Sequence, residues 1–330
     1  MADVPDELWT LDAHCDSIER RSSRGLSLDL CVAEDGCHVN TARLRAGNLR
    51  GLFAMVGEQD LLASLRMIDG VYRIAAAHPD ELALCTTAAD VRTAVEAGRA
   101  AIVMTIEGQS MFAEQIEQLR NWHRLGVRVC SLTHNEGTED TPHALQVSRS
   151  HFGYLSPAER AALRREQKGL TDFARTSLAE MGRLGLACDL AHANEVTFWE
   201  TLECATGPVC YTHGNCAALC PHTRNMTDEM MTALAGKGGV VGLCFYGPFV
   251  SQDDPTLDDY VEHVLHALDL MGEDGVGIGT DFDGVPEGAV MAVPEPSRMG
   301  DLWEALDRRG IPRRVLVKIA HDNFLRMLPA

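Results

Sequence analysis

Histidine and carboxylate side chains follow short apolar runs at six places along this 330-residue sequence. The residues are His14, Asp16, Glu107, His134, Asp189, His192, His213, Asp281 and Asp283. Imidazole nitrogens and carboxylate oxygens are ligands that suit zinc in hydrolytic sites. One such residue alone would be explained as a solvated strand end or a hydrogen-bonded core side chain. Because the same context recurs six times, the pattern predicts a metal centre.

The apolar runs are short and rich in β-branched or small residues, so each is interpreted as a buried strand. The eight runs are Leu8–His14, Leu49–Val56, Ala101–Glu107, Val127–His134, Leu186–His192, Pro208–His213, Val240–Tyr246 and Val276–Asp281. Amphipathic stretches separate them. The alternation predicts one (β/α)8 TIM-type barrel over residues 1–330, in which all strands open at their carboxyl ends onto one face. A further apolar run, Leu82–Cys85, is expected to be an accessory element.

Helical periodicity supports the same architecture. The clearest patterns cover Asp60–Ala77, Ala113–Leu125, Leu170–Leu184, Met226–Ala235 and Leu257–Leu270. Gly126, Gly185, Gly239 and Gly275 stand where helices are expected to end, the usual place of a left-handed glycine. The alternative, an open doubly wound sheet, predicts a glycine-rich phosphate loop, and neither GxGxxG nor GxxxxGK[ST] occurs.

A pair of neighbouring cations needs a ligand that bridges them. A modified lysine is one known solution, but the three lysines, Lys168, Lys237 and Lys318, all lie at or near predicted helices. A carboxylate is therefore expected to bridge, and Glu107, at a strand end, is placed to do so.

With these residues in view, the chain resembles the renal (membrane) dipeptidase family, peptidase family M19 of the amidohydrolase superfamily, from His14 to the C-terminus. The resemblance rests on the order and spacing of several motifs. They are His14-x-Asp16, IEG at 106–108, LTHN at 132–135, DLAH at 189–192, THG at 212–214, GTDFDG at 279–284 and DNFLRML at 322–328.

The resemblance implies two zinc ions per chain, one held by His14 and Asp16 and the other by His192 and His213, with Glu107 as the bridge. It implies a hydroxide nucleophile shared by the zinc ions, which attacks the peptide carbonyl of a small dipeptide, including dipeptides with a C-terminal D-residue.

The resemblance also gives roles to residues around that centre. Asp281 handles protons, His134 steadies the developing oxyanion, Arg224 binds the terminal carboxylate, and Tyr246 contacts substrate. Other nearby residues are expected to be structural: Cys15 as a packed thiol, and Asp283, Asn323 and Arg326 as residues that fix the barrel's end.

One segment departs from the family pattern. The stretch after His134 has no tryptophan, and residues 135–169 are polar and rich in His, Arg and Ser. This segment is expected to form a long loop over the site. Two alternatives therefore stay open: another binuclear-metal activity (N-acyl amino acid hydrolase, lactonase or deaminase), and a non-catalytic metal-binding scaffold.

Composition narrows the partners. The formal net charge of −19 disfavours nucleic acid and anionic membranes. Eleven cysteines without a CxxC pair, and an acidic N-terminus without an apolar signal core, predict reduced thiols in a cytoplasmic protein. A small dipeptide-like substrate and a homodimer are the expected partners.

Overall fold

The computed structural model describes residues 4–57, 60–108, 111, 115–134 and 153–330. Its centre is a closed parallel barrel in which β1 pairs with both β2 and β9. The barrel strands are β1 (Thr10–Cys15), β2 (Leu49–Met55), β4 (Ala100–Ile106), β5 (Val127–Ser131), β6 (Ala187–Asp189), β7 (Val209–Tyr211), β8 (Val240–Leu243) and β9 (Val276–Ile278). The predicted (β/α)8 barrel is confirmed.

The ninth apolar run is strand β3 (Leu82–Leu84), which lies outside the closed barrel. It pairs with the first residues of β4, from Ala100 to Ile102, whereas the later residues of β4 pair with β5. The prediction of an accessory element is therefore confirmed.

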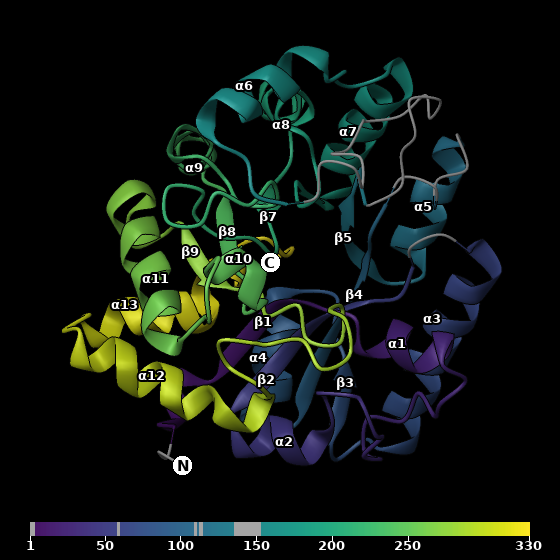
Figure 1. The fold of residues 1–330 in the computed structure, drawn as a ribbon. Coiled ribbons are helices and arrows are strands. Elements are labelled where there is room, and N and C mark those ends of the chain that lie inside the picture. Colours follow the sequence, from purple (N-terminus) through teal and green to yellow (C-terminus); the bar gives the residue numbers. More distant parts are fainter. Residues whose placement is uncertain (1–3, 58–59, 109–110, 112–114, 135–152) are drawn as a thin grey trace.

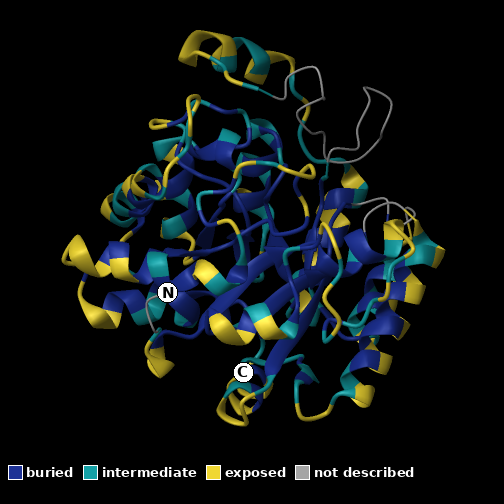
Figure 2. Ribbon diagram, turned by 60° about the horizontal axis from the view of Figure 1, so that its bottom comes forward, coloured by how far each residue is buried: buried dark blue, intermediate teal, exposed yellow. Residues whose placement is uncertain are grey.

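Helices surround the barrel (Figure 1). They are α1 (Ser17–Ser23), α2 (Thr41–Ala46), α3 (Leu61–Ala77), α4 (Ala88–Glu96), α5 (Ile116–Arg124), α6 (Pro157–Glu166), α7 (Asp172–Leu184), α8 (Glu195–Cys204), α9 (Asp228–Gly236), α10 (Gly247–Val250), α11 (Leu257–Met271), α12 (Met299–Arg308), α13 (Arg313–Val317) and α14 (Asn323–Leu325). All five predicted helical patterns correspond to helices. Their outer faces carry most of the exposed residues, while the strands are buried (Figure 2).

Two apolar layers hold these elements together. Inside the barrel, small side chains such as Ala13, Ala101 and Val103 fill the narrow interior. Phe53 and Phe324 meet edge to face at 6.0 Å, within this inner cluster. The larger cluster packs the outer faces of the strands against the helices. This solid interior leaves the rim at the carboxyl ends of the strands as the place for a site.

Most strands end earlier than predicted, so the candidate residues lie in the first positions of the following loops. β6 ends at Asp189 and β9 at Ile278, which places His192 and Asp281 three residues beyond regular pairing. Both residues have left-handed backbones, with φ of 65° and 61°. A left-handed residue turns the backbone out of the hydrogen-bonded pairing of the sheet. The hydrophobic periodicity of the sequence does not reveal that turn.

The prediction of which glycines end the helices is confirmed only in part. Gly126 and Gly185 have positive φ, as expected for a residue that closes a helix. After α9 and α11, however, Gly238 and Gly272 take the left-handed conformation instead of Gly239 and Gly275. In each case the left-handed turn lies nearer to the helix than predicted, because further residues are needed to link that turn to the first paired residue of the strand.

The segment predicted as one long loop over 135–169 contains helix α6. Ser156 accepts a hydrogen bond from the backbone N–H of Glu159, whose side chain accepts one from the Ser156 N–H in return. Pro157 occupies the first turn. The Ser-Pro-Ala-Glu sequence therefore has the pattern typical of a helix N-terminus. Residues 135–152 lie outside the described residues.

Two further findings concern the whole chain. All eleven cysteines are free thiols, as predicted. Across the described ranges, no helix has both the length and the apolar character needed to cross a bilayer.

Candidate metal centre

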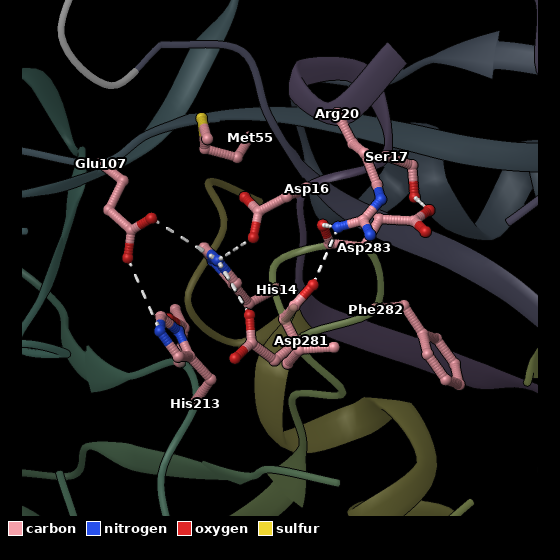
Figure 3. A network of polar contacts seen from close by, with 12 residues as sticks. His14, Asp16, Ser17, Arg20, Met55, Glu107, His213, Asp281, Phe282 and Asp283 are labelled. Atoms are coloured by element: carbon pink, nitrogen blue, oxygen red, sulfur yellow. Dashed lines mark hydrogen bonds and ion pairs between the residues drawn. The ribbon is translucent and has the colours of Figure 1, made fainter. Parts of the chain in front are cut away.

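The carboxyl end of β1 carries the first two candidate ligands. His14 is within β1, and Asp16 lies between β1 and α1, directly before the first residue of the helix. Nε2 of His14 lies 3.4 Å from Oδ2 of Asp16. Asp12 fixes this end by accepting a hydrogen bond from the His14 backbone N–H. Figure 3 shows Asp16, Glu107 and Asp281 turned toward the His14 imidazole.

Glu107 lies between the two groups of imidazoles, directly after β4. Its Oε2 is 3.7 Å from Nε2 of His14 and 3.8 Å from Nε2 of His134. Its Oε1 is 3.0 Å from Nε2 of His192 and 3.6 Å from Nε2 of His213. The two oxygens thus face different sets of nitrogens, which is the geometry that a bridging carboxylate requires.

The imidazoles pack on one another around that carboxylate. The rings of His14 and His213 stack with centroids 3.9 Å apart, and Nε2 of His192 is 3.0 Å from Nε2 of His213. His134 lies against His192 with a centroid distance of 4.6 Å. Ring nitrogens brought this close inside a buried site converge on a common centre.

The donor set fits divalent cations. At this rim, three of the groups in the described part of the chain have ligand atoms that all lie within 4.8 Å of one another: His14, Glu107 and His213; Glu107, His134 and His192; His14, Asp16 and Asp281. Of the described side chains here, Nε2 of His14 and Oδ1 of Asp16 are buried without a hydrogen-bond partner. A buried polar atom without a partner is costly, and a metal ion would satisfy both.

Electrostatics also favours a cation. Burial raises the pKa of Glu107, although the positive charges of His134 and His14 oppose that shift. Burial raises the pKa of Asp281, and the negative charge of Asp16 adds to the shift. Burial lowers the pKa values of His192 and His213, which keeps these imidazoles neutral and able to bind a metal. Crowded carboxylates beside neutral imidazoles form a site that attracts positive charge.

Asp281 reaches the same cluster from the loop after β9. Its Oδ1 is 4.0 Å from Nε2 of His14. The neighbouring Gly284 leaves room for two carboxylates, because a Cβ there would lie 2.0 Å from Oδ2 of Asp16 and 2.2 Å from Oδ1 of Asp281. Glycine is thus required where the loop passes over these side chains.

A cavity of about 250 Å³ opens beside the cluster. Its lining residues are His14, Asp16, Glu107, His134, His192, His213, Arg224, Tyr246, Phe249, Asp281, Gly284, Val285 and Pro286. All nine residues predicted to bind metal, handle protons or contact substrate line this one cavity. The volume is below the roughly 300–1,000 Å³ of a drug-sized pocket, so it suits a small ligand.

Arg224 forms one wall of the cavity and is buried. Its guanidinium donates to the Tyr211 hydroxyl at 3.0 Å and to the His213 carbonyl at 3.4 Å, and lies 5.5 Å from the centre of the Phe249 ring. The buried Nε has no hydrogen-bond partner within the described part of the chain. A buried guanidinium beside a cavity, with a donor to spare, suits an anionic group of a ligand.

Residues expected to be structural lie away from this cavity. Asp283 accepts hydrogen bonds from the Ser17 hydroxyl and the His38 backbone N–H, which joins its loop to α1 and to the segment after α1. Asn323 donates to the carbonyls of Glu273 and Val276. Arg326 donates to the Asp274 carbonyl, and Cys15 is packed in the core.

Sequence reasoning missed several residues of the cavity wall and its support. Phe249, Val285 and Pro286 line the cavity but carry no chemical signal in the sequence. Asp12 could have been noticed, because a carboxylate inside an otherwise apolar strand needs partners. It accepts hydrogen bonds from the backbone N–H and the hydroxyl of Thr280.

Comparison with known proteins decides what this site belongs to. The family model of membrane dipeptidase (peptidase family M19) matches residues 1–330. The chain belongs to the membrane dipeptidase family. It is thereby a metallo-dipeptidase, a hydrolase that acts on peptide bonds.

Curated relatives in fungi agree with this membrane dipeptidase assignment. The chain is 31% identical to the dipeptidase tcpJ of Claviceps purpurea over 88% of this chain and 68% of the relative. It is 32% identical to the dipeptidase ataJ of Aspergillus terreus over 81% of this chain and 67% of the relative. The chain thus spans about two thirds of the length of these relatives.

Solved structures show the same fold. A metallo peptidase from Rhodobacter sphaeroides, bound to a phosphinate mimic of the dipeptide L-Ala-D-Ala, superposes with a TM-score of 0.84 at 23% identity, covering 96% of this chain and 97% of that one. An amidohydrolase from Pseudomonas aeruginosa superposes with a TM-score of 0.76 at 26% identity, covering 94% and 98%.

Proposed function

We propose that this membrane dipeptidase family member hydrolyses small dipeptides with two zinc ions held by His14, Asp16, Glu107, His192 and His213. The observation that carries the proposal is the arrangement of Glu107, whose two oxygens face separate groups of imidazoles in one buried cavity. Zinc fits because the donors are nitrogen and oxygen atoms of buried, closely spaced side chains. When bound, zinc would supply a Lewis acid for the scissile carbonyl and acidify water.

Arg224 supports a substrate with a free carboxylate. Its planar guanidinium can bond two oxygens at once, and its position beside His213 would place that carboxylate within reach of the metal ligands. The small cavity then limits the rest of the ligand to about one further residue. A dipeptide satisfies both requirements.

The remaining side chains can move the protons of the reaction. Asp281, as the carboxylate, would accept a proton from the attacking water as the new carbon–oxygen bond forms. The same proton would pass to the departing amine as the peptide carbon–nitrogen bond breaks, so that two amino acids leave. Nε2 of His134 lies on the cavity wall, where it could donate to the developing oxyanion.

The proposal includes dipeptides whose C-terminal residue has the D configuration. It rests on the fold shared with the Rhodobacter sphaeroides metallo peptidase, whose bound ligand mimics L-Ala-D-Ala. Paired assays of L-Ala-L-Ala and L-Ala-D-Ala, with release of free alanine as the readout, test this part separately.

The experiment that tests the function is a panel of dipeptides, matching N-acyl amino acids and lactones, assayed with protein of known zinc content. We expect about two zinc ions per chain and release of amino acids from dipeptides. Zinc-loaded protein that turns over lactones or N-acyl amino acids but no dipeptide would overturn the substrate assignment. Protein that binds no zinc would overturn the metal centre as well.

Arg224→Ala provides the matched test of substrate recognition. Loss of a buried guanidinium–carboxylate pair costs about 2–5 kcal/mol, so kcat/KM for dipeptides should fall at least about 30-fold, mainly through KM. A dipeptide amide, which lacks the carboxylate, should lose much less. Equal losses for both substrates would show that Arg224 does not bind the carboxylate.

A further inference from the structure

A chain of hydrogen bonds runs behind His213, on the side of the ring away from the cavity. Nδ1 of His213 is 2.9 Å from the Thr212 hydroxyl oxygen. That hydroxyl is in turn 2.6 Å from Oδ2 of Asp189, whose Oδ1 accepts from the Thr212 backbone N–H at 2.9 Å. Asp189, Thr212 and His213 are all buried. Two neighbouring strands, β6 and β7, are thereby joined directly behind a candidate metal ligand.

The direction of each hydrogen bond in this series follows from the Asp189 carboxylate at its end. A carboxylate accepts hydrogen bonds and has none to donate, so the Thr212 O–H must donate to Asp189. The Thr212 oxygen is then available only as an acceptor, and the Nδ1–H of His213 must donate to it. In a neutral imidazole this leaves the lone pair on Nε2, the nitrogen that faces Glu107 and His192.

The same arrangement occurs a second time on the barrel, where its direction is independently fixed. Asp12 accepts from the backbone N–H and the hydroxyl of Thr280, at 2.8 and 2.7 Å. The Thr280 oxygen also accepts from the Phe282 backbone N–H at 3.0 Å. Because a backbone N–H can only donate, the Thr280 O–H must point to Asp12. In both places, therefore, an aspartate on one strand orients a threonine that follows the end of the adjacent strand.

The backbone of Thr212 has little freedom to rearrange. Its carbonyl oxygen lies against the backbones of Gly242 and Gly279, where an added Cβ would come within 2.0 and 1.7 Å. The backbone that carries the Thr212 side chain is thus fixed, and the direction of the hydroxyl proton remains to be set. Asp189 sets it.

We propose that Asp189 and Thr212 are positioning residues that hold His213 in the Nδ1–H form, with the Nε2 lone pair directed at the metal. The inference rests on the proposed metal centre for its role but concerns a property of the metal-free protein. It explains why a buried aspartate and threonine accompany this ligand, and it assigns them an effect on metal affinity rather than a contact with substrate.

Asp189→Asn is the decisive variant, because it preserves the shape of the side chain but reverses the direction of the hydrogen bonds from residue 189 to His213. The asparagine oxygen would take the place of Oδ1, and its amide group would donate to the Thr212 oxygen. The Thr212 O–H would then turn to Nδ1 of His213, and the ring proton would move to Nε2. Nitrogen NMR of metal-free, 15N-histidine-labelled protein should show this change of tautomer, and zinc affinity should fall about 10- to 100-fold.

Threonine variants supply a second test and its controls. Thr212→Val removes the hydroxyl and should also weaken zinc binding, whereas Thr212→Ser retains it and should bind within about threefold of the wild type. Thr201→Val is the matched control, since Thr201 is equally buried on α8 and its hydroxyl has no hydrogen-bond partner among the described residues. Zinc affinity is measured by competition with a chelator, and circular dichroism verifies folding.

The outcomes separate this inference from the proposed function. An unchanged His213 tautomer in Asp189→Asn, or wild-type zinc affinity in both Asp189→Asn and Thr212→Val, would overturn the inference. Absence of zinc binding by the wild type would overturn the proposed function, while the NMR comparison would still decide whether Asp189 sets the tautomer. Should Thr212→Val fail to fold, the isosteric Asp189→Asn and the Thr212→Ser variant still decide the question.

Discussion

At the scale of single residues, the site depends on side chains aimed by unusual backbone. His192 and Asp281 both have left-handed φ values, a conformation that costs a non-glycine residue about 1–3 kcal/mol. At Asp281 the turn is held by the backbone N–H of Asp281, which donates to the His14 carbonyl at 3.1 Å. Strain of this kind persists where the surrounding structure fixes it, and here it directs both side chains into the cavity.

Asp281→Asn tests the proton-transfer role at that position. Asparagine tolerates the left-handed backbone but cannot accept a proton, so kcat should fall about 10²- to 10⁴-fold. Zinc content should be unchanged, because Asp281 is not among the five proposed ligands. Steady-state kinetics and elemental analysis of the same preparation provide the measurement. Retention of more than a tenth of the wild-type kcat would contradict the role.

Gly284→Ala tests how tightly the loop covers the carboxylates. The added Cβ would meet Asp16 and Asp281 at 2.0 and 2.2 Å, so one of the two must move. We expect at least about a 10-fold loss of kcat/KM, since small misplacements at a reacting centre are costly. Gly236→Ala is the control, because a Cβ there meets nothing within 4 Å. Equal activity in the two variants would show that the loop yields without effect.

The sequence could predict these residues only as types at strand ends. His14, Glu107 and His213 stand out because each interrupts or ends an apolar run, and that context survives in the structure. The supporting pair of Asp12 and Thr280 could not be matched, because the two residues meet only through closure of the barrel from its first strand to its last. Such pairings depend on topology rather than on local pattern.

At the scale of elements, hydrophobic periodicity predicted the long helices and the barrel strands but not where regular pairing stops. Helix α3 begins where Asp60 accepts a hydrogen bond from the Ala63 backbone N–H, and the predicted helical pattern Asp60–Ala77 starts at that same residue. α6 was missed because its buried face is weak: none of its residues is buried. Its capping signal was present, but a segment judged by polarity alone resembles a loop.

Helices α5 and α7 are joined by a charged cluster whose strength should depend on pH. Glu180 accepts from Arg120 at 2.5 Å and from Arg183 at 2.7 Å. Hydrogen bonds from Arg183, and then from Arg120, lower the pKa of Glu180 from 4.5 to about 2. A lowered folded-state pKa means that the stabilisation is present above about pH 4.5 and is lost as the pH falls toward 2.

Glu180→Gln should therefore lower Tm at pH 7 but much less at pH 3. The expected difference at pH 7 is about 1 kcal/mol, because the arginine partners are partly exposed and solvent screens the pair. Thermal unfolding of both proteins at the two pH values gives the comparison. Glu96→Gln, at the exposed end of α4, is the control and should leave Tm unchanged. A Tm difference that grows at pH 3 would refute the interpretation.

At the scale of the whole molecule, the barrel brings together ligands from separate parts of the chain. The proposed ligands lie at the carboxyl ends of β1, β4, β6 and β7, and of these strands only β6 and β7 pair directly with each other. Buried carboxylates that repel one another would loosen this rim, whereas cations between them would join the strand ends. Metal binding should therefore contribute to the stability of the entire fold.

Removal of metal should consequently lower Tm. A ligand present at 100 times its Kd stabilises the folded state by about 2.7 kcal/mol, which corresponds to roughly 4 °C for a chain of this size. Calorimetry before and after treatment with a chelator measures the shift, and added zinc should reverse it. Glu107→Gln, which weakens the ligand common to both ions, should respond to the chelator much less. An equal response in the variant would mean that the stabilising metal binds elsewhere, because the proposed centre cannot keep two cations together without the charge of Glu107.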